Sequence, residues 1–539
     1  MPHVNPRYEA APRPPSGQDH RAVVVVGGGL VGLTLALDLA RHGVAVTLLD
    51  EEDSVATGSR AICFAQRTLE IFGRLGLGER LLEKGVTWQT GRVFHRESQA
   101  FAFDLLPEAG HQNPAFVNIP QYHVEAWLVE ACAAAGVDLR WRHAVAGLET
   151  DAEGATLAVE TPEGPYTLRA DWLLACDGAR SFVRRSLGLT FQGQVFPDRF
   201  LIADVVIRGE VAFPAERWFW FDPPFHPGQS VLLHKQPDDL WRIDFQLGPE
   251  ADAAVETEPG RVRDRVAAML GPQVPFELEW VSLYTFRCRR LDRFIHGRVI
   301  FVGDSAHQVS PFGARGGNGG VQDADNLAWK LASVLRGQAG PGLLASYEAE
   351  RIVAADENIL HSTRATDFIS PKSAAARAYR DAVLELAEGQ AFARALVNSG
   401  RLSRPAHLAG SPLNAPDDGH WPGGAAPGSP APDAPLLRDG APDWLLHHLG
   451  GDFALLVFDA VWSPVAGLAP LGLRPVFITA EETPGALWDH AGLAAARYGA
   501  PPGGAVLIRP DQHIAARFAA PRAGAVQAAL ARAMGGTPP

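Results

Sequence analysis

The residues with the clearest chemical potential form the segment GDSAHQVSPFGARGGNGG, from Gly303 to Gly320. The apolar run Val299 to Val302 predicts a strand that ends at Gly303 and Asp304. A glycine-rich loop follows, and an amphipathic helix is expected to begin near Asp323. An aspartate and a row of unhindered backbone N–H groups beside a helix N-terminus suit a ribityl hydroxyl, a phosphate or an electron-rich ring edge.

A second motif, GGGLVG at 27–32, follows the apolar run Val23 to Val26 and meets the pattern G-x-G-x-x-G. A leucine-rich helix and a second strand, Val44 to Leu49, come next, and that strand ends at Asp50. The spacing of roughly 20 residues is typical of a carboxylate that holds a ribose 2′-OH. The pattern predicts a dinucleotide site; a glycine-rich turn that only packs a helix on a sheet is the alternative. The charge of Asp50 would oppose a 2′-phosphate, which favours FAD or NAD over NADP as the tightly bound ligand.

A third segment, CDGARS at 176–181, ends another apolar strand, Trp172 to Ala175. Three arginines follow its Asp-Gly pair, at positions 180, 184 and 185. Taken alone, this segment is equally typical of a β-turn with solvated arginines.

Together the three motifs resemble the single-component, FAD-dependent aromatic hydroxylases of the para-hydroxybenzoate hydroxylase and phenol hydroxylase type, including 3-(3-hydroxyphenyl)propionate hydroxylases. The resemblance covers nearly the whole chain and is strongest over residues 21–190 and 285–365. It implies an α/β fold in which a Rossmann-like FAD-binding domain is interleaved with a mixed β-sheet substrate domain. A thioredoxin-like α/β domain is expected at the C-terminal end.

The expected domain boundaries follow from composition and from this resemblance. Residues 1–20 are rich in proline and predict a disordered arm. Residues 21–395 hold the FAD-binding and substrate domains, with the substrate sheet at about 86–110 and 191–284. Residues 396–436, dense in Pro, Gly and Asp, predict a linker or a long wrapping loop. Residues 437–539 form the thioredoxin-like domain, with helices expected near 484–497 and 522–534; its expected role is structural or dimer-forming.

Composition limits the classes of partner and location. The 539 residues carry a net charge of −13, which disfavours nucleic acid and anionic membranes as partners. The four cysteines show no paired spacing, so neither a disulfide framework nor a metal site is expected, and none lies beyond Cys288. No stretch resembles a signal peptide or the ~18 apolar residues of a membrane span. The expectation is a cytoplasmic, soluble enzyme, with a homodimer as the expected oligomeric state.

The resemblance implies a set of FAD contacts. Gly27, Gly29 and Gly32 would admit the pyrophosphate, Asp50 would hold the adenosine ribose, and Glu51 replaces a base that the family often has. Arg60 matches an arginine that reaches the pyrophosphate or ribityl chain, and Gln121 a ribityl-contacting glutamine; a solvated arginine and an ordinary helix-start residue are the alternatives. Asp304 would bind the ribityl hydroxyls. The further cofactor residues are Leu30, Val31, Val145, Asp177, Gly178 and Gly303.

Residues at the reactive end of the flavin are implied in the same way. Gly316, Gly317 and Asn318 would direct backbone N–H groups at the flavin N1–C2=O edge, where negative charge collects on reduction. Pro311 would lie beside flavin C4a on the substrate side. His307 is near the flavin in sequence, although a structural histidine fits equally well.

The resemblance also implies the reaction. NADPH or NADH would reduce FAD without a dedicated domain, since the chain has a single G-x-G-x-x-G, and O2 would give a flavin C4a-hydroperoxide that hydroxylates a phenolic ring. Ile62 stands where phenol hydroxylase relatives can carry an aspartate that assists the phenol.

The expected strand Trp241 to Leu247 alternates, and its polar face, Arg242, Asp244 and Gln246, could line the substrate pocket. A face that is solvated or hydrogen-bonded structurally is the alternative. His226, His234 and Tyr284 are weaker candidates for the same pocket.

Three other functions stay open. The enzyme could be a tailoring or inactivating monooxygenase of a polycyclic polyketide or antibiotic, a flavin reductase that transfers no oxygen, or a flavin-binding protein without turnover.

Overall fold

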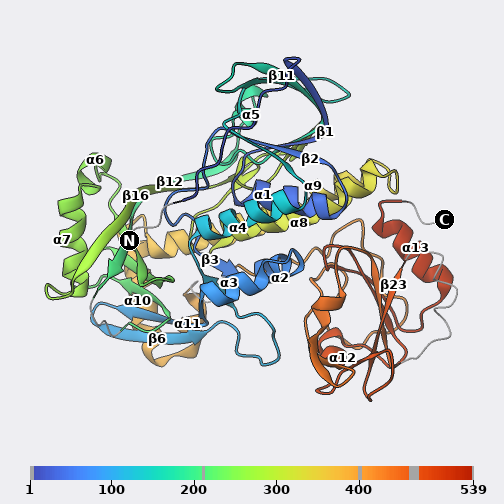
Figure 1. Cartoon of the computed structure of the whole chain (residues 1–539). Coiled ribbons are helices and arrows are strands. Elements are labelled where there is room, and N and C mark those ends of the chain that lie inside the picture. The colour runs from blue at the N-terminus through green and yellow to red at the C-terminus, as the bar shows by residue number, and fades with distance from the viewer. Residues whose placement is uncertain (1–4, 209–212, 398–402, 460–472, 537–539) are drawn as a thin grey trace.

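The computed structural model describes residues 5–208, 213–397, 403–459 and 473–536. It contains a parallel-sheet region, a mixed sheet and a C-terminal α/β domain; the mixed sheet and the C-terminal domain lie toward opposite ends of the long helices (Figure 1). The predicted fold class is confirmed.

The first sheet is mostly parallel and holds the strands that precede the three motifs. Its strand order is β17 (Ile295–His296), β18 (Val299–Phe301), β11 (Tyr166–Ala175), β1 (Gln18–Val26), β2 (Val46–Asp50) and β8 (Asp138–Trp141), with β10 (Ala155–Glu160) and β9 (Ala144–Thr150) attached to β11. The register aligns Val26 with Leu49 and Ala175, and Ala175 with Phe301. All three pairings are parallel, so the carboxyl ends of β1, β2, β11 and β18 meet at one edge of the sheet.

Long helices cover this sheet and pack against one another: α1 (Leu30–Arg41), α4 (Gln121–Ala134), α8 (Arg315–Leu335) and α9 (Gly342–Ile369) (Figure 1). The expectation that a helix opens near Asp323 is wrong, because α8 already begins at Arg315. The glycines that suggested a loop lie in its first turns, where they let α8 approach α1. A Cβ at Gly320 would lie 2.5 Å from Val31 Cγ2. Close packing here outweighs the low helix propensity of glycine.

The mixed sheet joins strands from distant parts of the chain. Its order is β19 (His307–Gln308), β16 (Phe276–Arg290), β12 (Gln192–Ile207), β15 (Leu240–Leu247), β14 (Ser230–Lys235), β13 (Arg217–Phe221), β5 (Thr90–His95) and β6 (Ser98–Asp104). Its pairings are antiparallel except for β13 with β5. A small antiparallel sheet joins β3 (Cys63–Ala65), β7 (Phe116–Asn118) and β4 (Val86–Trp88), and β5 and β6 of the mixed sheet lie between β4 and β7 in sequence.

The remaining helices of the first two regions are short or peripheral. They are α2 (Gln66–Arg74), α3 (Gly78–Lys84), α5 (Phe182–Ser186), α6 (Ala253–Glu256), α7 (Pro259–Leu270), α10 (Ala374–Gly389) and α11 (Ala391–Leu396). Within the described ranges, none of the helices combines the length and the apolar content that crossing a bilayer requires.

The C-terminal domain is built on a third sheet, in the order β21 (Ala441–Trp444), β20 (Pro435–Arg438), β24 (Leu487–Trp488), β23 (Arg474–Thr479), β22 (Ala454–Phe458), β25 (Ala505–Ile508) and β26 (Ile514–Phe518). Helices α12 (Leu493–Tyr498) and α13 (Ala523–Ala533) complete it. The helix expected over 484–497 is mostly absent. Gly485 and Gly492 both adopt positive φ, so the chain turns twice and forms β24 between them.

Two segments of low-complexity composition are ordered by packing. The expected disordered arm is wrong from Asn5 on, since Tyr8 stacks on Trp141 at 4.5 Å and His143 Nε2 lies 2.9 Å from Ala11 O. In the expected linker, Leu408 and Leu413 are buried within residues 403–434. Apolar side chains in these segments find partners that composition alone does not reveal.

Candidate active site

One edge of the parallel sheet brings the three motifs together. Gly27 follows β1, Asp50 ends β2, and Asp177 and Asp304 follow β11 and β18. Because these strands are neighbours in register, their following loops lie side by side. Four segments predicted to bind one cofactor therefore share one edge, at the N-terminus of α1.

The glycines of the first motif allow a close crossing of backbones. Gly27 adopts φ +109, and a Cβ there would lie 2.4 Å from Cys176 O. A Cβ at Gly32 would lie 1.9 Å from Gly27 O. Any side chain at these two positions would separate α1 from the loop between β1 and α1. Such a loop exposes backbone N–H groups at a helix N-terminus, which is the usual environment of a pyrophosphate.

Asp50 is held beside this loop. Its Oδ2 accepts a hydrogen bond from Gly28 N at 2.5 Å, and its Oδ1 accepts one from Glu52 N at 2.8 Å. Burial raises the pKa of Asp50, against these two hydrogen bonds. Its neighbour Glu51 is exposed, and the charge of Glu51 adds to the rise in the pKa of Asp50.

Glu125 is a residue that the sequence reasoning missed. It is fully buried; Oε1 accepts hydrogen bonds from Leu30 N at 2.8 Å and Gln121 Nε2 at 2.7 Å, and Oε2 accepts one from Ala56 N at 2.8 Å. Burial raises the pKa of Glu125, opposed by these hydrogen bonds. A signal was present: Gln121 and Glu125 are four residues apart on α4, and an acid on the apolar side of a helix needs a buried partner.

Gln121 forms a hydrogen bond with the residue that follows Arg60 in the chain. Gln121 Oε1 accepts a hydrogen bond from Ala61 N at 2.9 Å, which fixes the segment that carries Arg60. The Arg60 side chain is exposed, and its positive charge is close enough to lower the pKa values of Glu125 and Asp304. Arg60 thus places a positive charge at the edge where the motifs meet.

Asp304 is exposed, although Gly303 and Ser305 on either side of it are buried. Burial nevertheless raises the pKa of Asp304; the charges of His307 and Arg60 oppose this shift, and that of Asp323 adds to it. The Asp304 carboxylate is therefore accessible to a ligand, while its buried neighbours fix the loop that carries it. Tyr284 has the same character: it is 40% exposed, and burial together with Asp304 raises its pKa to about 12.

The position of the N-terminus of α8 is fixed by Asn318, whose side-chain amide forms four hydrogen bonds. Asn318 Oδ1 accepts hydrogen bonds from Ala65 N at 2.9 Å and Thr68 Oγ1 at 2.6 Å. Its Nδ2 donates to Cys63 O at 2.8 Å and Ala314 O at 2.5 Å. All its donors and acceptors are used. Its side chain therefore ties α8 to β3 and is not available to a ligand.

The first turn of α8 leaves N–H groups without acceptors inside the helix. Gly316 and Gly317 lie in this turn, and a Cβ at Gly316 would meet only Val309 within 4 Å. Glycine thus keeps the approach to these N–H groups open. Asn318 is one position further along, where the helical N–H normally bonds to the residue four back.

His307 belongs to a buried ionic cluster. Its Nε2 lies 2.6 Å from Asp323 Oδ2, and Arg351 Nε donates to Asp323 Oδ1 at 2.6 Å. Although burial opposes it, the charges of His307 and Arg351 hold the pKa of Asp323 below its usual range. Asp323 also accepts a hydrogen bond from Gly303 N at 3.1 Å, which fixes the Asp304 loop. This arrangement favours the structural interpretation of His307.

Pro311 lies in a turn closed by a hydrogen bond from Ala314 N to Pro311 O of 3.0 Å. The next residue, Phe312, packs against Phe200 and Phe286 of the mixed sheet, with ring centroids 5.1 Å and 4.9 Å apart. The proline turn therefore lies where the motif loop meets an aromatic face of that sheet.

The predicted polar face of β15 is buried and bonded within the protein. Arg242 donates to Ser59 O at 2.5 Å, to Arg60 O at 2.9 Å and to Asp244 Oδ1 at 2.7 Å. Gln246 accepts from Ser230 N at 3.0 Å and donates to Ser370 Oγ at 2.7 Å. Gln246 therefore has a structural role, as the alternative interpretation of this face expected. Arg242 holds the segment that carries Arg60 in place.

Of the remaining predicted residues, Asp177 and Gly178 lie at the motif edge, whereas Val145, His226 and Ile62 lie in other parts of the structure. Asp177 Oδ2 accepts a hydrogen bond from Val183 N at 3.0 Å, and burial raises the pKa of Asp177; Gly178 adopts φ +72. Val145 is half-buried on β9 and pairs with Val159. His226 Nε2 lies 2.7 Å from Gln246 O. Ile62 is buried in an apolar cluster with Trp88 and Phe116, so no acid stands there.

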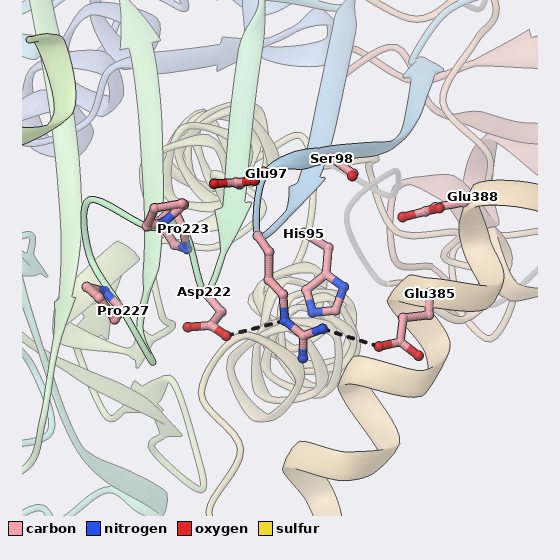
Figure 2. Close-up of a pocket in the computed structure, with 10 residues that line it drawn as sticks. His95, Glu97, Ser98, Asp222, Pro223, Pro227, Glu385 and Glu388 are labelled. Atoms are coloured by element: carbon pink, nitrogen blue, oxygen red, sulfur yellow. Dashed lines mark ion pairs between the residues drawn. The ribbon is translucent and has the colours of Figure 1, made fainter.

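A surface pocket of about 470 Å³ lies at the other end of the mixed sheet (Figure 2). It is lined by residues of the β5–β6 turn, the β13–β14 turn and α10, among them His95, Asp222 and Glu385. Arg96 pairs there with Asp222 at 3.7 Å and with Glu385 at 3.5 Å. None of the predicted site residues lines it, so it is separate from the motif edge.

Comparison with known proteins agrees with this geometry. The family model described as an FAD binding domain matches residues 20–362, and that of the aromatic-ring hydroxylase C-terminal domain matches residues 424–537. The 6-methylpretetramide 4-monooxygenase of Streptomyces rimosus is 32% identical, covering 93% of this chain and 92% of that protein.

Two further similarities differ in extent. A 3-(3-hydroxy-phenyl)propionate/3-hydroxycinnamic acid hydroxylase of Klebsiella pneumoniae is 31% identical over 68% of this chain and 66% of its own. The crystal structure of the flavin-dependent monooxygenase PieE with FAD and substrate superposes with a TM-score of 0.81 at 25% identity, covering 96% of this chain and 99% of that one.

Proposed function

Because the chain belongs to the family of FAD-dependent aromatic-ring hydroxylases, and is a flavoprotein monooxygenase of that family, we propose that it hydroxylates a phenolic ring of a polycyclic aromatic substrate with O2 and with NADPH or NADH. The observation that carries this proposal is the extent of similarity. The relative named for a polycyclic substrate matches over 93% of this chain, C-terminal domain included, whereas the relative named for a small phenolic acid matches over 68%.

The residues at the motif edge fit FAD. Gly27 and Gly32 tolerate no side chain, which leaves a backbone cradle for a pyrophosphate. Asp50, which is hydrogen-bonded to that cradle, would hold a ribose hydroxyl, and the accessible carboxylate of Asp304 would hold the ribityl chain. Arg60 supplies the positive charge that two phosphates need.

Bound FAD would supply the chemistry of O2 activation and oxygen transfer to an aromatic carbon. The chain's own contribution is electrostatic and steric. The N–H groups of Gly316 and Gly317, at the positive end of α8, would stabilise negative charge on the adjacent ring edge. They are held by the side chain of Asn318, so little reorganisation is needed when charge develops.

Aromatic residues beside the proline turn would exclude water from the reacting ring. Phe200, Phe286 and Phe312 form one packed group between the mixed sheet and the motif loop. Exclusion of water prevents wasteful release of reduced oxygen. With Ile62 apolar, the group that activates the phenol comes from elsewhere. The candidate we propose is Tyr284, which is 40% exposed and whose pKa is raised by burial and by the charge of Asp304, so that its neutral hydroxyl could accept a hydrogen bond from the substrate phenol.

A small phenolic acid is the second candidate substrate, favoured by the similarity to the Klebsiella hydroxylase. A flavin reductase that transfers no oxygen is the remaining alternative.

The test uses the purified FAD-loaded protein with NADPH and NADH and a panel of hydroxylated naphthalenes, anthraquinones and phenolic acids. We expect a polycyclic phenol to accelerate both O2 uptake and reduced-nicotinamide oxidation and to gain the mass of one oxygen atom. Acceleration by phenolic acids alone would favour the second candidate. Oxidation of the nicotinamide with no oxygen incorporated into any aromatic would favour the reductase.

A further inference from the structure

A row of charged and polar side chains crosses four strands of the mixed sheet. The register pairs Asp204 of β12 with Arg242 of β15, Arg242 with His234 of β14, and His234 with Arg217 of β13. Directly paired residues present their side chains on the same face of a sheet. We call these four residues the charged row. All of them are buried.

One half of the charged row is satisfied. Asp204 accepts hydrogen bonds from Ser59 Oγ at 2.6 Å and Ser59 N at 3.2 Å. Arg242 binds Asp244 and the carbonyl groups of residues 59 and 60. Through these contacts, Asp204 and Arg242 fix the segment that carries Arg60.

The half of the charged row that contains Arg217 and His234 has polar atoms without hydrogen-bond partners among the described residues. Arg217 is 3% exposed, and its Nε and Nη1 have no hydrogen-bond partner among the described residues. Its guanidinium lies over the rings of Phe219 at 4.8 Å and Trp88 at 5.8 Å. His234 is 2% exposed; its Nε2 lies 3.7 Å from Asp244 Oδ2, whereas its Nδ1 has no hydrogen-bond partner among the described residues. Gln236, two residues further along from His234, is fully buried, and both polar atoms of its amide lack partners.

Such a cluster is costly in a ligand-free protein. A buried guanidinium needs a counter-charge, and each buried amide atom without a hydrogen bond carries a desolvation penalty. Asp244, the nearest carboxylate whose charge acts on Arg217, is bonded to Arg242 at 2.7 Å. In the described part of the chain, no carboxylate lies within ion-pairing distance of Arg217. Nε and Nη1 of Arg217 and the two amide atoms of Gln236 could therefore be satisfied by a bound ligand.

The unsatisfied half lies next to the candidate active site. The charges of Arg217 and Arg242 both act on Cys63, which follows Ile62 on β3 and whose carbonyl receives a hydrogen bond from Asn318 at the start of α8. The ring of Trp88, over which Arg217 lies, belongs to the apolar cluster that contains Ile62 and that Ala314 packs against. A substrate ring held at the start of α8 could therefore direct a substituent along β3 to Arg217.

We propose that Arg217, Gln236 and His234 form an anion subsite that receives an acidic oxygen of the substrate, a carboxylate or the ionised enol or phenol of a fused-ring system. Arg217 is the counter-ion, and Gln236 pairs with the acidic oxygen and with a neighbouring carbonyl or hydroxyl. The subsite rests on the proposed function, because it names the chemical class of substrate that the same site takes.

The experiment measures binding by the FAD-loaded protein, followed by the change in flavin absorbance. The probes are 3-hydroxy-2-naphthoate, its neutral methyl ester, and 1,2-dihydroxyanthraquinone at pH values below and above its first ionisation. We expect the wild type to prefer the anionic forms at least tenfold. Arg217→Met should abolish this preference while leaving FAD content and affinity for the ester unchanged. A preference confined to the naphthoate identifies a carboxylate as the ligand group, and one confined to the anthraquinone identifies an ionised hydroxyl.

Arg96→Met, in the surface pocket of Figure 2, is the matched control and should leave every affinity unchanged. The thermal unfolding midpoint of the ligand-free protein gives a second readout: Arg217→Met should leave it unchanged or raise it, because an uncompensated charge is removed. If this variant does not load FAD, Gln236→Leu replaces it and should weaken anion binding at least threefold.

Equal affinity for acid and ester, an unchanged preference in both variants, or a lowered midpoint in Arg217→Met would overturn the subsite alone. Absence of binding by all probes, with another aromatic stimulating oxygen incorporation, would also overturn the subsite but leave the proposed function standing. Absence of both binding and any aromatic-stimulated turnover would overturn the two together.

Discussion

Two buried ionic clusters of this protein are built in opposite ways. The first is the charged row of the mixed sheet, in which Arg217 has no counter-ion. The second joins the C-terminal domain to α8 and α9, and we call it the junction network; it comprises Lys330, Glu350, Arg509 and Asp511. Arg509 donates to Glu350 at 2.6 Å and 3.0 Å and to Asp511 at 2.9 Å, and Lys330 donates to Glu350 at 2.6 Å.

The difference separates charges that hold the fold from charges that await a ligand. Despite its burial, Glu350 is kept ionised by Arg509 and Lys330, which hold its pKa well below the usual range. Burial lowers the pKa of Lys330 to about 8, against the attraction of Glu350. Every charge in the junction network has partners from another segment, so the network is complete without a ligand. The charged row is complete only at its Asp204 end.

The sharpest test of this contrast is one substitution made in each cluster. Arg509→Met leaves Glu350 and Asp511 without their principal partner, and removing one member of a buried ion pair costs about 3–5 kcal/mol. Arg217→Met removes a charge that has no partner and should be neutral or stabilising. Urea unfolding of both variants measures the difference. Equal losses of unfolding free energy would show that Arg217 is as structural as Arg509.

The satisfied end of the charged row predicts a pH effect. Burial raises the pKa of Asp204 to about 6, against the attraction of Arg242 and the hydrogen bonds from Ser59. A carboxyl whose folded pKa is raised favours the folded state when protonated, so its contribution is lost as pH rises from about 4 to 6. Relative to the wild type, Asp204→Asn should gain roughly 3 kcal/mol of unfolding free energy between pH 4 and pH 7, at 1.4 kcal/mol per pKa unit. Denaturant titrations at both pH values check this, and a constant difference would contradict it.

A third test addresses the packing of α8, the helix that carries Lys330 of the junction network, without changing any charge. In Gly320→Ala, the new Cβ would lie 2.5 Å from Val31 Cγ2, so α8 must shift from α1 at a cost of about 1–3 kcal/mol. The expected result is weaker FAD retention on gel filtration. Gly73→Ala in α2, where nothing lies within 4 Å of the new Cβ, is the matched control and should retain FAD fully.

The smallest effect is expected at the surface. Lys84 forms an ion pair with Asp238 at 2.7 Å, and both side chains are exposed. Lys84→Met should change the free energy of unfolding by less than about 1 kcal/mol. The same urea titrations provide this baseline; a loss as large as that of Arg509→Met would mean that burial is not what distinguishes the junction network.

Local patterns were sufficient to predict the parallel strands and the edge where their loops meet. The apolar runs before Gly27 and Asp177 ended where the structure ends a strand, and the run before Asp304 ended one residue beyond β18. They succeeded because buried parallel strands and their following loops are contiguous in sequence. The start of α8 was missed, because glycine signals a loop in local propensity while here it serves helix packing.

Long-range partners could not be predicted in the same way. Glu125 acquires its role from Leu30 and Ala56, which lie 95 and 69 residues away. The charged row depends on the register of four strands, and no single strand reveals that Arg217 faces no carboxylate. The polar face of β15 was identified, but whether it is solvated, bonded or ligand-facing depends on Ser59 and Ser370, which come from distant segments.

Helix α8 spans residues 315–335, about 30 Å at 1.5 Å per residue. Its first turn lies at the candidate active site, Asn326 contacts Asp511 of the junction network, and Lys330 belongs to that network. One continuous helix therefore contributes both to the candidate cofactor site and to the contact with the C-terminal domain. Limited proteolysis of the C-terminal domain, with and without bound FAD, would show whether occupancy at one end of the helix is felt at the other.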